Sequence, residues 1–196
     1  MRRSLVSAAV AAVTLSLAVG AGPALAAGAQ DAVHAEAHLY LAGAFFVHRD
    51  AVTVPGRLVA VQGVVRPYVP GQTVQVKSFV GRRLLQTDRL RVKPDGTSLG
   101  TFSERVRSPA PGIVRVKVTH GRTPQMAGFS VQRALAALTP AAGFGARGLM
   151  VDLLQQRLAA LHLYIPQTGV FDQQTALALD AYHRLVGWGE GNAGAD

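Results

Sequence analysis

The sequence predicts an all-β sandwich followed by a small all-α helical module. Between residues 39 and 138, turn residues divide the chain into short apolar or alternating runs about every ten residues, a pattern typical of a sandwich. A linker of small residues follows at 139–147. From residue 148 onward, the apolar residues recur at helical spacing instead.

The expected strands alternate apolar and polar residues between turn signals such as Pro55-Gly56 and Pro94-Asp95-Gly96. The clearest is V-R-V-K-V at 114–118, where valines would face the core and cations would face water. The expected strands cover 39–47, 57–66, 72–80, 83–92, 99–106, 112–119 and 128–135.

Two amphipathic helices are expected in the C-terminal stretch, separated by the breaking residues Pro166, Thr168 and Gly169. Asp172 stands just before the second periodic run, where an N-cap carboxylate would accept hydrogen bonds from free amides of the first turn. The stripe of the first helix comprises Val151, Leu154, Leu158 and Leu161, and that of the second Phe171, Thr175, Ala178, Leu179, Tyr182 and Val186.

The C-terminal stretch resembles the peptidoglycan-binding domain of bacterial cell-wall enzymes. The family pattern is V-x-x-L-Q-x-x-L, then a Gly-x-Phe turn, then T-x-x-A-V-x-x-F-Q-x-x-x-G-L. The residues that match it are Val151, Leu154, Gln155, Leu158, Gly169, Phe171, Thr175, Ala178, Leu179, Tyr182, His183, Gly187 and Trp188.

The chain departs from the family pattern at two places. His162 replaces the usual glycine at a helix end that often needs a left-handed backbone, which glycine adopts freely. The family's third helix is missing, since residues 189–196 read G-E-G-N-A-G-A-D and carry no apolar stripe. The expectation is therefore a partial peptidoglycan-binding module at 148–196.

The resemblance implies a ligand site at the edge formed by the two helices and their loop. Aromatic faces and a few aimed hydrogen bonds typically hold sugars and peptide stems. We expect Tyr182 and Phe171 to belong to the core, while Trp188 could be either core or exposed. The candidate ligand-binding residues are Arg157, Tyr164, Gln167, Asp172, His183 and Trp188.

The sandwich region is similar to the bacterial immunoglobulin-like domains that precede peptidoglycan-binding modules in wall-associated L,D-transpeptidase-type proteins. The residues that carry this resemblance are Pro70-Gly71-Gln72-Thr73-Val74 and Pro111-Gly112-Ile113-Val114-Arg115-Val116. They match the strand openings P-G-x-x-V and G-x-Y-x-V-x. The resemblance implies an immunoglobulin-like sandwich at 39–138.

The N-terminus reads as a secretory signal peptide. Met1-Arg2-Arg3 precedes an apolar run at 5–19 and an Ala-Leu-Ala site that ends at Ala26. The run is shorter than the roughly 20 residues of a membrane span, although an uncleaved anchor stays an alternative. We expect a signal peptide at 1–26 and a flexible lead-in at 27–38, so the mature chain would be secreted to the cell wall without a stable membrane span.

The formal net charge is +9, and the basic residues crowd the middle of the chain. On an exported protein this indicates attraction to anionic surfaces such as teichoic-type polymers, acidic glycans or phospholipid headgroups, and it argues against nucleic acid as a partner. The alternative is that these cations are solvated faces of strands. The expected partners are peptidoglycan or anionic wall polymers.

No catalytic set is recognisable in the sequence. The chain has no cysteine, which excludes thiol nucleophiles, disulfides and Cys-ligated metals. Its six histidines form no H-E-x-x-H motif, and no G-x-S-x-G elbow is present. His34 and His38 lie four residues apart but in the expected flexible lead-in. We therefore expect no catalytic residues, no metal and no cofactor.

The favoured interpretation is a secreted, non-catalytic protein that binds peptidoglycan. L,D-transpeptidase-type proteins often carry a catalytic domain after the binding module, and this chain has neither its Cys nor the room for it. One alternative is therefore a truncated remnant of such an enzyme. A further alternative is a structural envelope protein that binds another protein.

Overall fold

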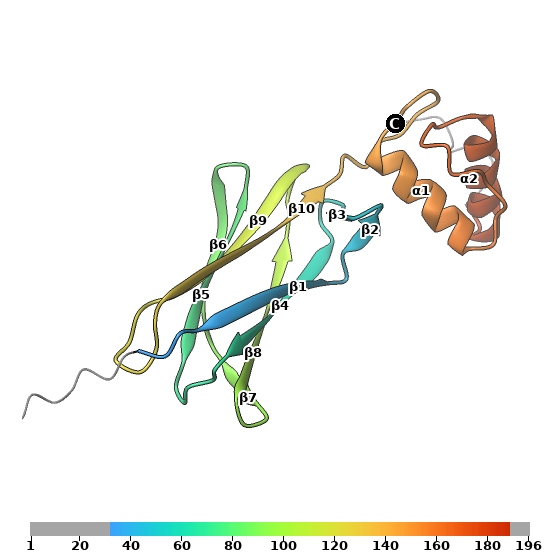
Figure 1. Ribbon diagram of the computed structural model, residues 1–196. Coiled ribbons are helices and arrows are strands. Elements are labelled where there is room, and N and C mark those ends of the chain that lie inside the picture. Colours follow the sequence, from blue (N-terminus) through green and yellow to red (C-terminus); the bar gives the residue numbers. More distant parts are fainter. Residues whose placement is uncertain (1–31, 189–196) are drawn as a thin grey trace, which may run out of the picture. The chain divides into compact units, whose positions relative to one another are not determined.

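The computed structural model describes residues 32–188, which form ten strands and two helices (Figure 1). The strands are β1 (Glu36–Ala42), β2 (Phe45–Val47), β3 (Asp50–Thr53), β4 (Leu58–Arg66), β5 (Thr73–Val80), β6 (Arg83–Arg91), β7 (Lys93–Asp95), β8 (Leu99–Arg107), β9 (Gly112–His120) and β10 (Phe129–Ala137). The helices are α1 (Leu149–Ala160) and α2 (Gln173–Leu185).

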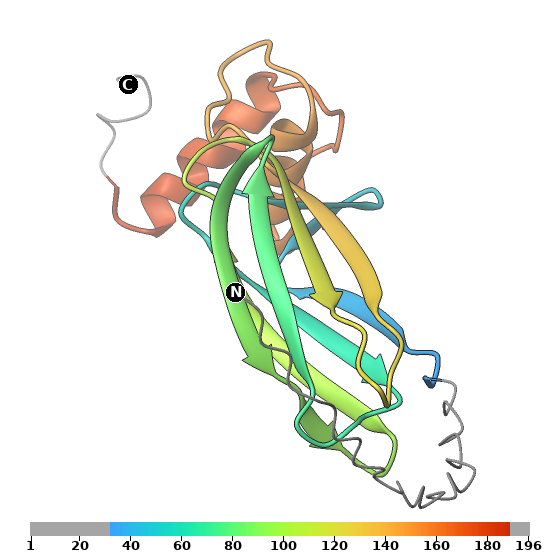
Figure 2. The ribbon, with the colours of Figure 1, turned by 90° about the vertical axis from the view of Figure 1, so that its left-hand side faces the viewer.

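The strands form two sheets, in the order β1-β4-β8-β7 and β2-β3-β10-β9-β5-β6. All pairs are antiparallel except β3 with β10, which run parallel. Figure 2 shows the long paired strands β5 and β6 of the six-stranded sheet. The two sheets bury one shared apolar cluster, so the strand region is a β-sandwich.

Alternation along the strands explains why they form a sandwich. In β4, residues Val59, Val61 and Val65 are buried, and the polar residues Gln62 and Arg66 are exposed. Val114, Val116 and Val118 of β9 are buried from the other sheet, with cations exposed between them. Each of these two strands therefore presents one apolar face to the core and one polar face to water.

A glycine and a phenylalanine occupy one site in this core. Gly63 of β4 lies directly opposite Phe102 of β8 in the ladder. A Cβ built on Gly63 would lie 2.0 Å from Cζ of the Phe102 ring. Because glycine has no side chain, the Phe102 ring can lie directly over the backbone of Gly63. Such close approach is a common reason for glycine inside a strand.

Several element boundaries differ from the sequence-based expectation. The run expected at 39–47 is divided into β1 and β2, and β1 begins at Glu36, inside the expected lead-in. Val33 also forms a bridge with Met126. The short strands β3 and β7 were not expected, because three or four residues carry too little alternation to be recognised.

The expectation of a separate all-α module is wrong. The structure is mostly β-sheet with only two helices in the described residues, and α1 packs on the strands: Leu153 shares a buried cluster with Val47 of β2 and Val52 of β3. Nε2 of His48 also lies 3.7 Å from Oδ2 of Asp152. The strands and the helices accordingly belong to a single compact unit.

The physical reason lies in the two apolar sides of α1. Leu158 packs with Ile165 and with Ala178 of α2, whereas Leu153 packs with the strands. Leu153 does not belong to the apolar stripe from which the pairing of the two helices was predicted. Leu161 does belong to that stripe, yet its side chain is largely exposed. Two short helices bury little apolar surface by themselves, so the second apolar side of α1 is buried against the strands instead.

The predicted signal peptide at 1–26 and the C-terminal residues 189–196 lie outside the described residues. Within residues 32–188, neither helix has the length and apolar character needed to cross a membrane.

Candidate functional site

The loop between α1 and α2 is organised by the side chain of Gln155, which is fully buried. Its Nε2 donates to the carbonyl oxygen of Val170 at 3.0 Å and to Oγ1 of Thr175 at 2.9 Å. Its Oε1 accepts from the backbone N–H of Gly169 at 2.9 Å. One amide from α1 therefore fixes the loop and the first turn of α2, as a buried polar group requires.

Asp172 caps α2, as its position before the helix predicts. Its Oδ1 accepts from the backbone N–H and from the hydroxyl of Thr175, both at 2.8 Å. These two hydrogen bonds, the backbone one first, hold the pKa of Asp172 below its ordinary value of 3.8. The carboxylate thus has a structural task and is less available to a ligand.

We expect the cap to make α2 sensitive to acid. A carboxyl whose pKa is depressed in the folded state contributes stability that is complete above its unfolded pKa and is lost as the pH falls through its folded pKa. The relevant window therefore extends downward from about pH 4. The variant Asp172→Asn is the matched comparison, because asparagine caps helices equally well and does not titrate.

Thermal unfolding of both chains between about pH 6 and pH 2 tests this expectation. The melting temperature of the natural chain should fall relative to that of Asp172→Asn as the pH is lowered, because the other carboxyl groups are common to both. A difference in melting temperature that stays constant over this range would contradict a stabilising charge on Asp172.

The loop itself carries the most exposed of the expected ligand residues. His162 follows α1 in a left-handed conformation, with φ of 63°. Tyr164 follows and is 98% exposed. Gln167 is also exposed.

Tyr164 borders an open hollow of about 370 Å³ on the surface of the two helices. Its other lining residues come from the loop and from α2, and they are Leu163, Gln174, Leu177, Ala178 and Ala181. Leu177 is 61% exposed. An aromatic ring and an aliphatic side chain that both face water beside a hollow form a surface suited to a partly apolar ligand.

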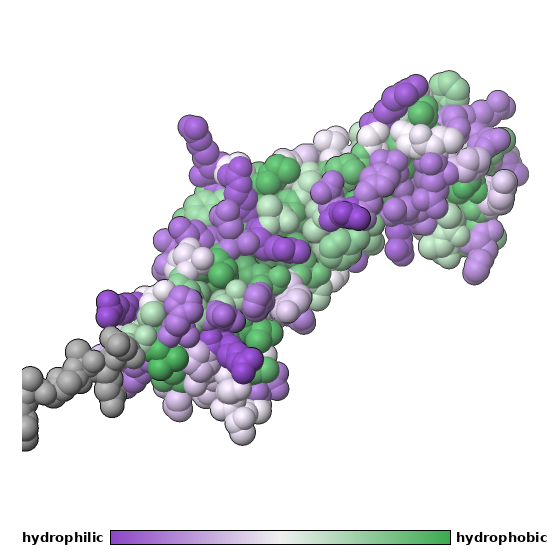
Figure 3. All heavy atoms as spheres, viewed as in Figure 1, coloured by the Kyte–Doolittle hydropathy of each residue, from purple (hydrophilic) through white to green (hydrophobic). Residues whose placement is uncertain are grey.

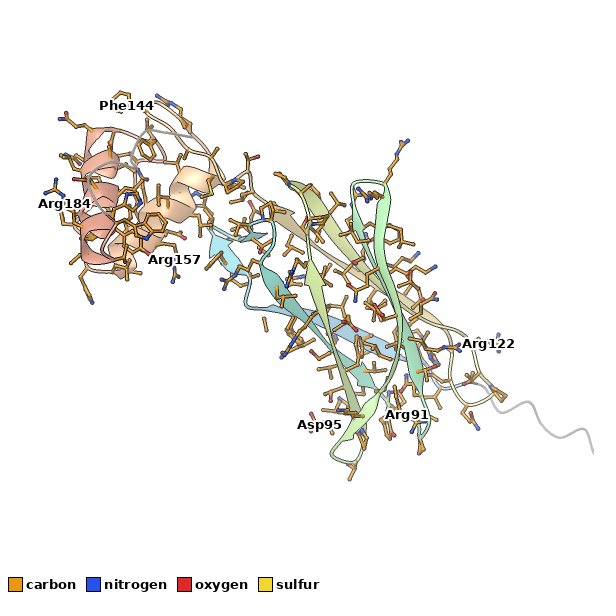
Figure 4. All side chains as sticks on the ribbon, turned by 180° about the vertical axis from the view of Figure 1, so that it is seen from behind. Arg91, Asp95, Arg122, Phe144, Arg157 and Arg184 are labelled. Atoms are coloured by element: carbon orange, nitrogen blue, oxygen red, sulfur yellow. The ribbon has the colours of Figure 1, made fainter. Side chains whose placement is uncertain are left out.

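The other expected residues are not gathered at this hollow. The ring of His183 lies against that of Trp188, with ring centroids 5.2 Å apart, at the C-terminal end of α2. Trp188 is 60% exposed. Arg157 lies on α1 with its guanidinium 5.3 Å from the Phe45 ring of β2 (Figure 4). Arg157 therefore belongs to the contact between α1 and the strands.

Sequence reasoning missed Leu177 and Gln174 as lining residues. The available signal was an apolar residue, Leu177, outside the apolar stripe of α2. On the face drawn in Figure 3, hydrophilic side chains cover much of the helices, with hydrophobic ones showing between them. Phe144, on the loop before α1 (Figure 4), is 79% exposed and belongs to none of the three buried hydrophobic clusters.

Two of the hollows on the sandwich are larger than the one at Tyr164. One, of about 610 Å³, is bordered by Tyr40, Gln62, Lys93 and their neighbours at the four-stranded sheet. The other, of about 460 Å³, is bordered by three arginines, Arg49, Arg115 and Arg133, together with Asp50 and the exposed Phe46. Clustered guanidinium groups are suited to carboxylate or phosphate. In residues 32–188, no group of three or more His, Asp and Glu side chains is placed to hold a metal ion.

Comparison with known proteins does not assign the chain to a family. No family model matches it, and no curated protein matches it. Among solved structures, it is similar to the solution NMR structure of a CARDB domain from Pyrococcus furiosus, at 10% identity and a TM-score of 0.31. The match covers 54% of this chain and 96% of that domain. A likeness of this size says nothing about the function of this chain.

Proposed function

We propose that the chain is a secreted, non-catalytic protein that binds bacterial peptidoglycan at the hollow bordered by Tyr164. The observation that carries the proposal is a tyrosine that is 98% exposed beside an open hollow lined by Leu177. Large side chains exposed together in this way often mark a binding surface. The resemblance of residues 148–188 to peptidoglycan-binding domains suggests which ligand this is.

The hollow offers the contacts that a glycan strand with peptide stems would use. The Tyr164 ring supplies a flat apolar face for a sugar, and its hydroxyl supplies a hydrogen bond. Gln174 adds an amide donor and acceptor at the same rim. Because the hydrogen bonds of Gln155 fix the start of α2, the rim would be largely formed before the ligand arrives.

Co-sedimentation with purified peptidoglycan sacculi tests the proposal. The assay is run in about 0.5 M salt, where attraction between exposed charges is largely screened. The natural chain should be enriched in the pellet, and Tyr164→Ala should lower the apparent affinity about fivefold to tenfold, the effect of removing an aromatic contact. Since Tyr164 is almost fully exposed, its loss should leave the melting temperature unchanged.

Tyr40→Ala is the matched control, because Tyr40 is a second exposed tyrosine, 56% accessible, on the sandwich. It should bind sacculi as the natural chain does. If Tyr40→Ala lost binding and Tyr164→Ala kept it, the site would be wrong. If the natural chain were not enriched at all, the proposed function would be wrong.

A further inference from the structure

The outer face of the six-stranded sheet carries a continuous row of cations, which we call the cationic stripe. It consists of Arg115 and Lys117 of β9, Lys77 of β5, and Arg89 and Arg91 of β6. Lys77 is half-buried and the other four are exposed. Arg91, labelled in Figure 4, stands at one end of the stripe.

Strand register shows how these residues form a row. Lys77 lies directly opposite Lys117. On the other side of β5, Gln75 lies opposite Arg89 and Thr73 opposite Arg91, so both arginines share the face of Lys77. The stripe crosses three strands diagonally, from Arg115 to Arg91. Strand geometry places the backbone positions of successive stripe residues about 5 to 8 Å apart.

One carboxylate, that of Asp50 on β3, borders the same hollow as Arg115 at one end of the stripe. The outward residues of β5, β6, β9 and β10, the strands that carry or adjoin the stripe, are Thr73, Gln75, Lys77, Phe79, Leu84, Thr87, Arg89, Arg91, Ile113, Arg115, Lys117, Thr119, Ser130, Gln132, Ala134 and Ala136. None of them is acidic. No ion pair to a stripe residue occurs within residues 32–188, where Arg115 only donates weakly, at 3.4 Å, to the carbonyl oxygen of Gly81.

Crowding these cations on one face lowers the stability of the folded chain. A bound anion would offset this repulsion, so the arrangement favours a binding role. Like charges directly opposite each other in a sheet are destabilising, and Lys77 and Lys117 occupy that position. At one end, Arg115 also borders the hollow of about 460 Å³, where the two further arginines Arg49 and Arg133 outnumber the single carboxylate of Asp50. The row of cations therefore leads into a cluster of arginines.

We propose that the cationic stripe binds a linear polyanion with one phosphodiester in each short repeat. The stripe is one cation wide, which suits a single polymer chain better than a plane of lipid headgroups. Its steps suit charges that recur at short intervals, and three of its five cations are arginines, whose planar donors pair well with phosphate. Among the outward residues of β5, β6, β9 and β10, Phe79 is the only aromatic one, so these strands lack the row of aromatic side chains on which single-stranded nucleic acid stacks.

Binding to synthetic poly(glycerol phosphate), measured by isothermal titration calorimetry at several salt concentrations, tests the inference. The affinity should fall with salt, with a slope that reports the phosphates contacted. The variant Lys77→Gln/Lys117→Gln should bind about tenfold more weakly, and its salt slope should be lower by about 1.4, that is, about 0.7 for each lost contact. Its melting temperature should be unchanged or higher, because the opposed like charges are gone.

The matched control is Arg105→Gln/Arg107→Gln, which removes the same charge from outward, exposed positions of β8 in the other sheet. It should bind as the natural chain does. Equal weakening in both variants would show attraction to net charge alone and would overturn the proposal.

Three other probes are compared at the same salt: polygalacturonate, single-stranded oligothymidylate and phosphatidylglycerol vesicles. Weaker binding of all three would support the proposal, and stronger binding of any one would overturn it. Failure of poly(glycerol phosphate) to bind at low salt would also overturn it. Peptidoglycan binding at the Tyr164 hollow is unaffected by either result, since it is measured in high salt with a different variant.

Discussion

Gly63→Ala should lower the free energy of unfolding by about 1 to 3 kcal/mol, the usual range for overpacked cores. The new methyl group would lie 2.0 Å from Cζ of Phe102 and also close to the ring's ε carbons. Phe102 is buried in the core that the two sheets share, although it also borders the hollow of about 610 Å³. Either the ring or the β4–β8 ladder must shift.

Chemical denaturation of three variants tests this reason as well as the size of the effect. Gly121→Ala is the control, since a Cβ at Gly121 meets nothing within 4 Å, and it should change stability little. Phe102→Leu removes the ring, so the double variant Gly63→Ala/Phe102→Leu should be clearly more stable than the sum of the two single changes predicts. Additive effects would show that the contact with Phe102 is not the cause.

Gln155→Leu should lower the free energy of unfolding by about 2 to 4 kcal/mol. Leucine has a similar volume, so the change mainly removes hydrogen bonds. The N–H of Gly169 loses its acceptor, and the hydroxyl of Thr175 loses its donor while keeping its own bond to Asp172. Buried polar groups without partners are the source of the cost.

Gln156→Leu is the matched control, because Gln156 is the same residue type one position further along α1 and lies outside the hydrogen-bond network that Gln155 forms. Hydrogen exchange should show faster exchange of the Gly169 amide in Gln155→Leu and not in Gln156→Leu. Equal effects of the two substitutions on stability and exchange would mean that the Gln155 network does not hold the loop.

Parts of the candidate site could be predicted and parts could not. The cap at Asp172 was predictable because an N-cap depends on residues within one turn of the chain. The hollow at Tyr164 was not, because its walls come from a loop and from the solvent side of α2, which periodicity treats as unspecific polar surface. The cationic stripe shows the same limit: the sequence shows outward cations on each strand, but only the register of β9, β5 and β6 aligns them.

Local sequence was enough to predict most of the sandwich strands, the two helical segments and the cap of the second helix, since each depends on alternation, periodicity or turn chemistry within a short stretch of chain. It was not enough to show that these helices fail to form a separate all-α module. That outcome depends on Leu153, a residue off the predicted stripe, meeting Val47 and Val52, which lie far earlier in the chain. Local patterns show which faces are apolar, and only the fold shows what covers them.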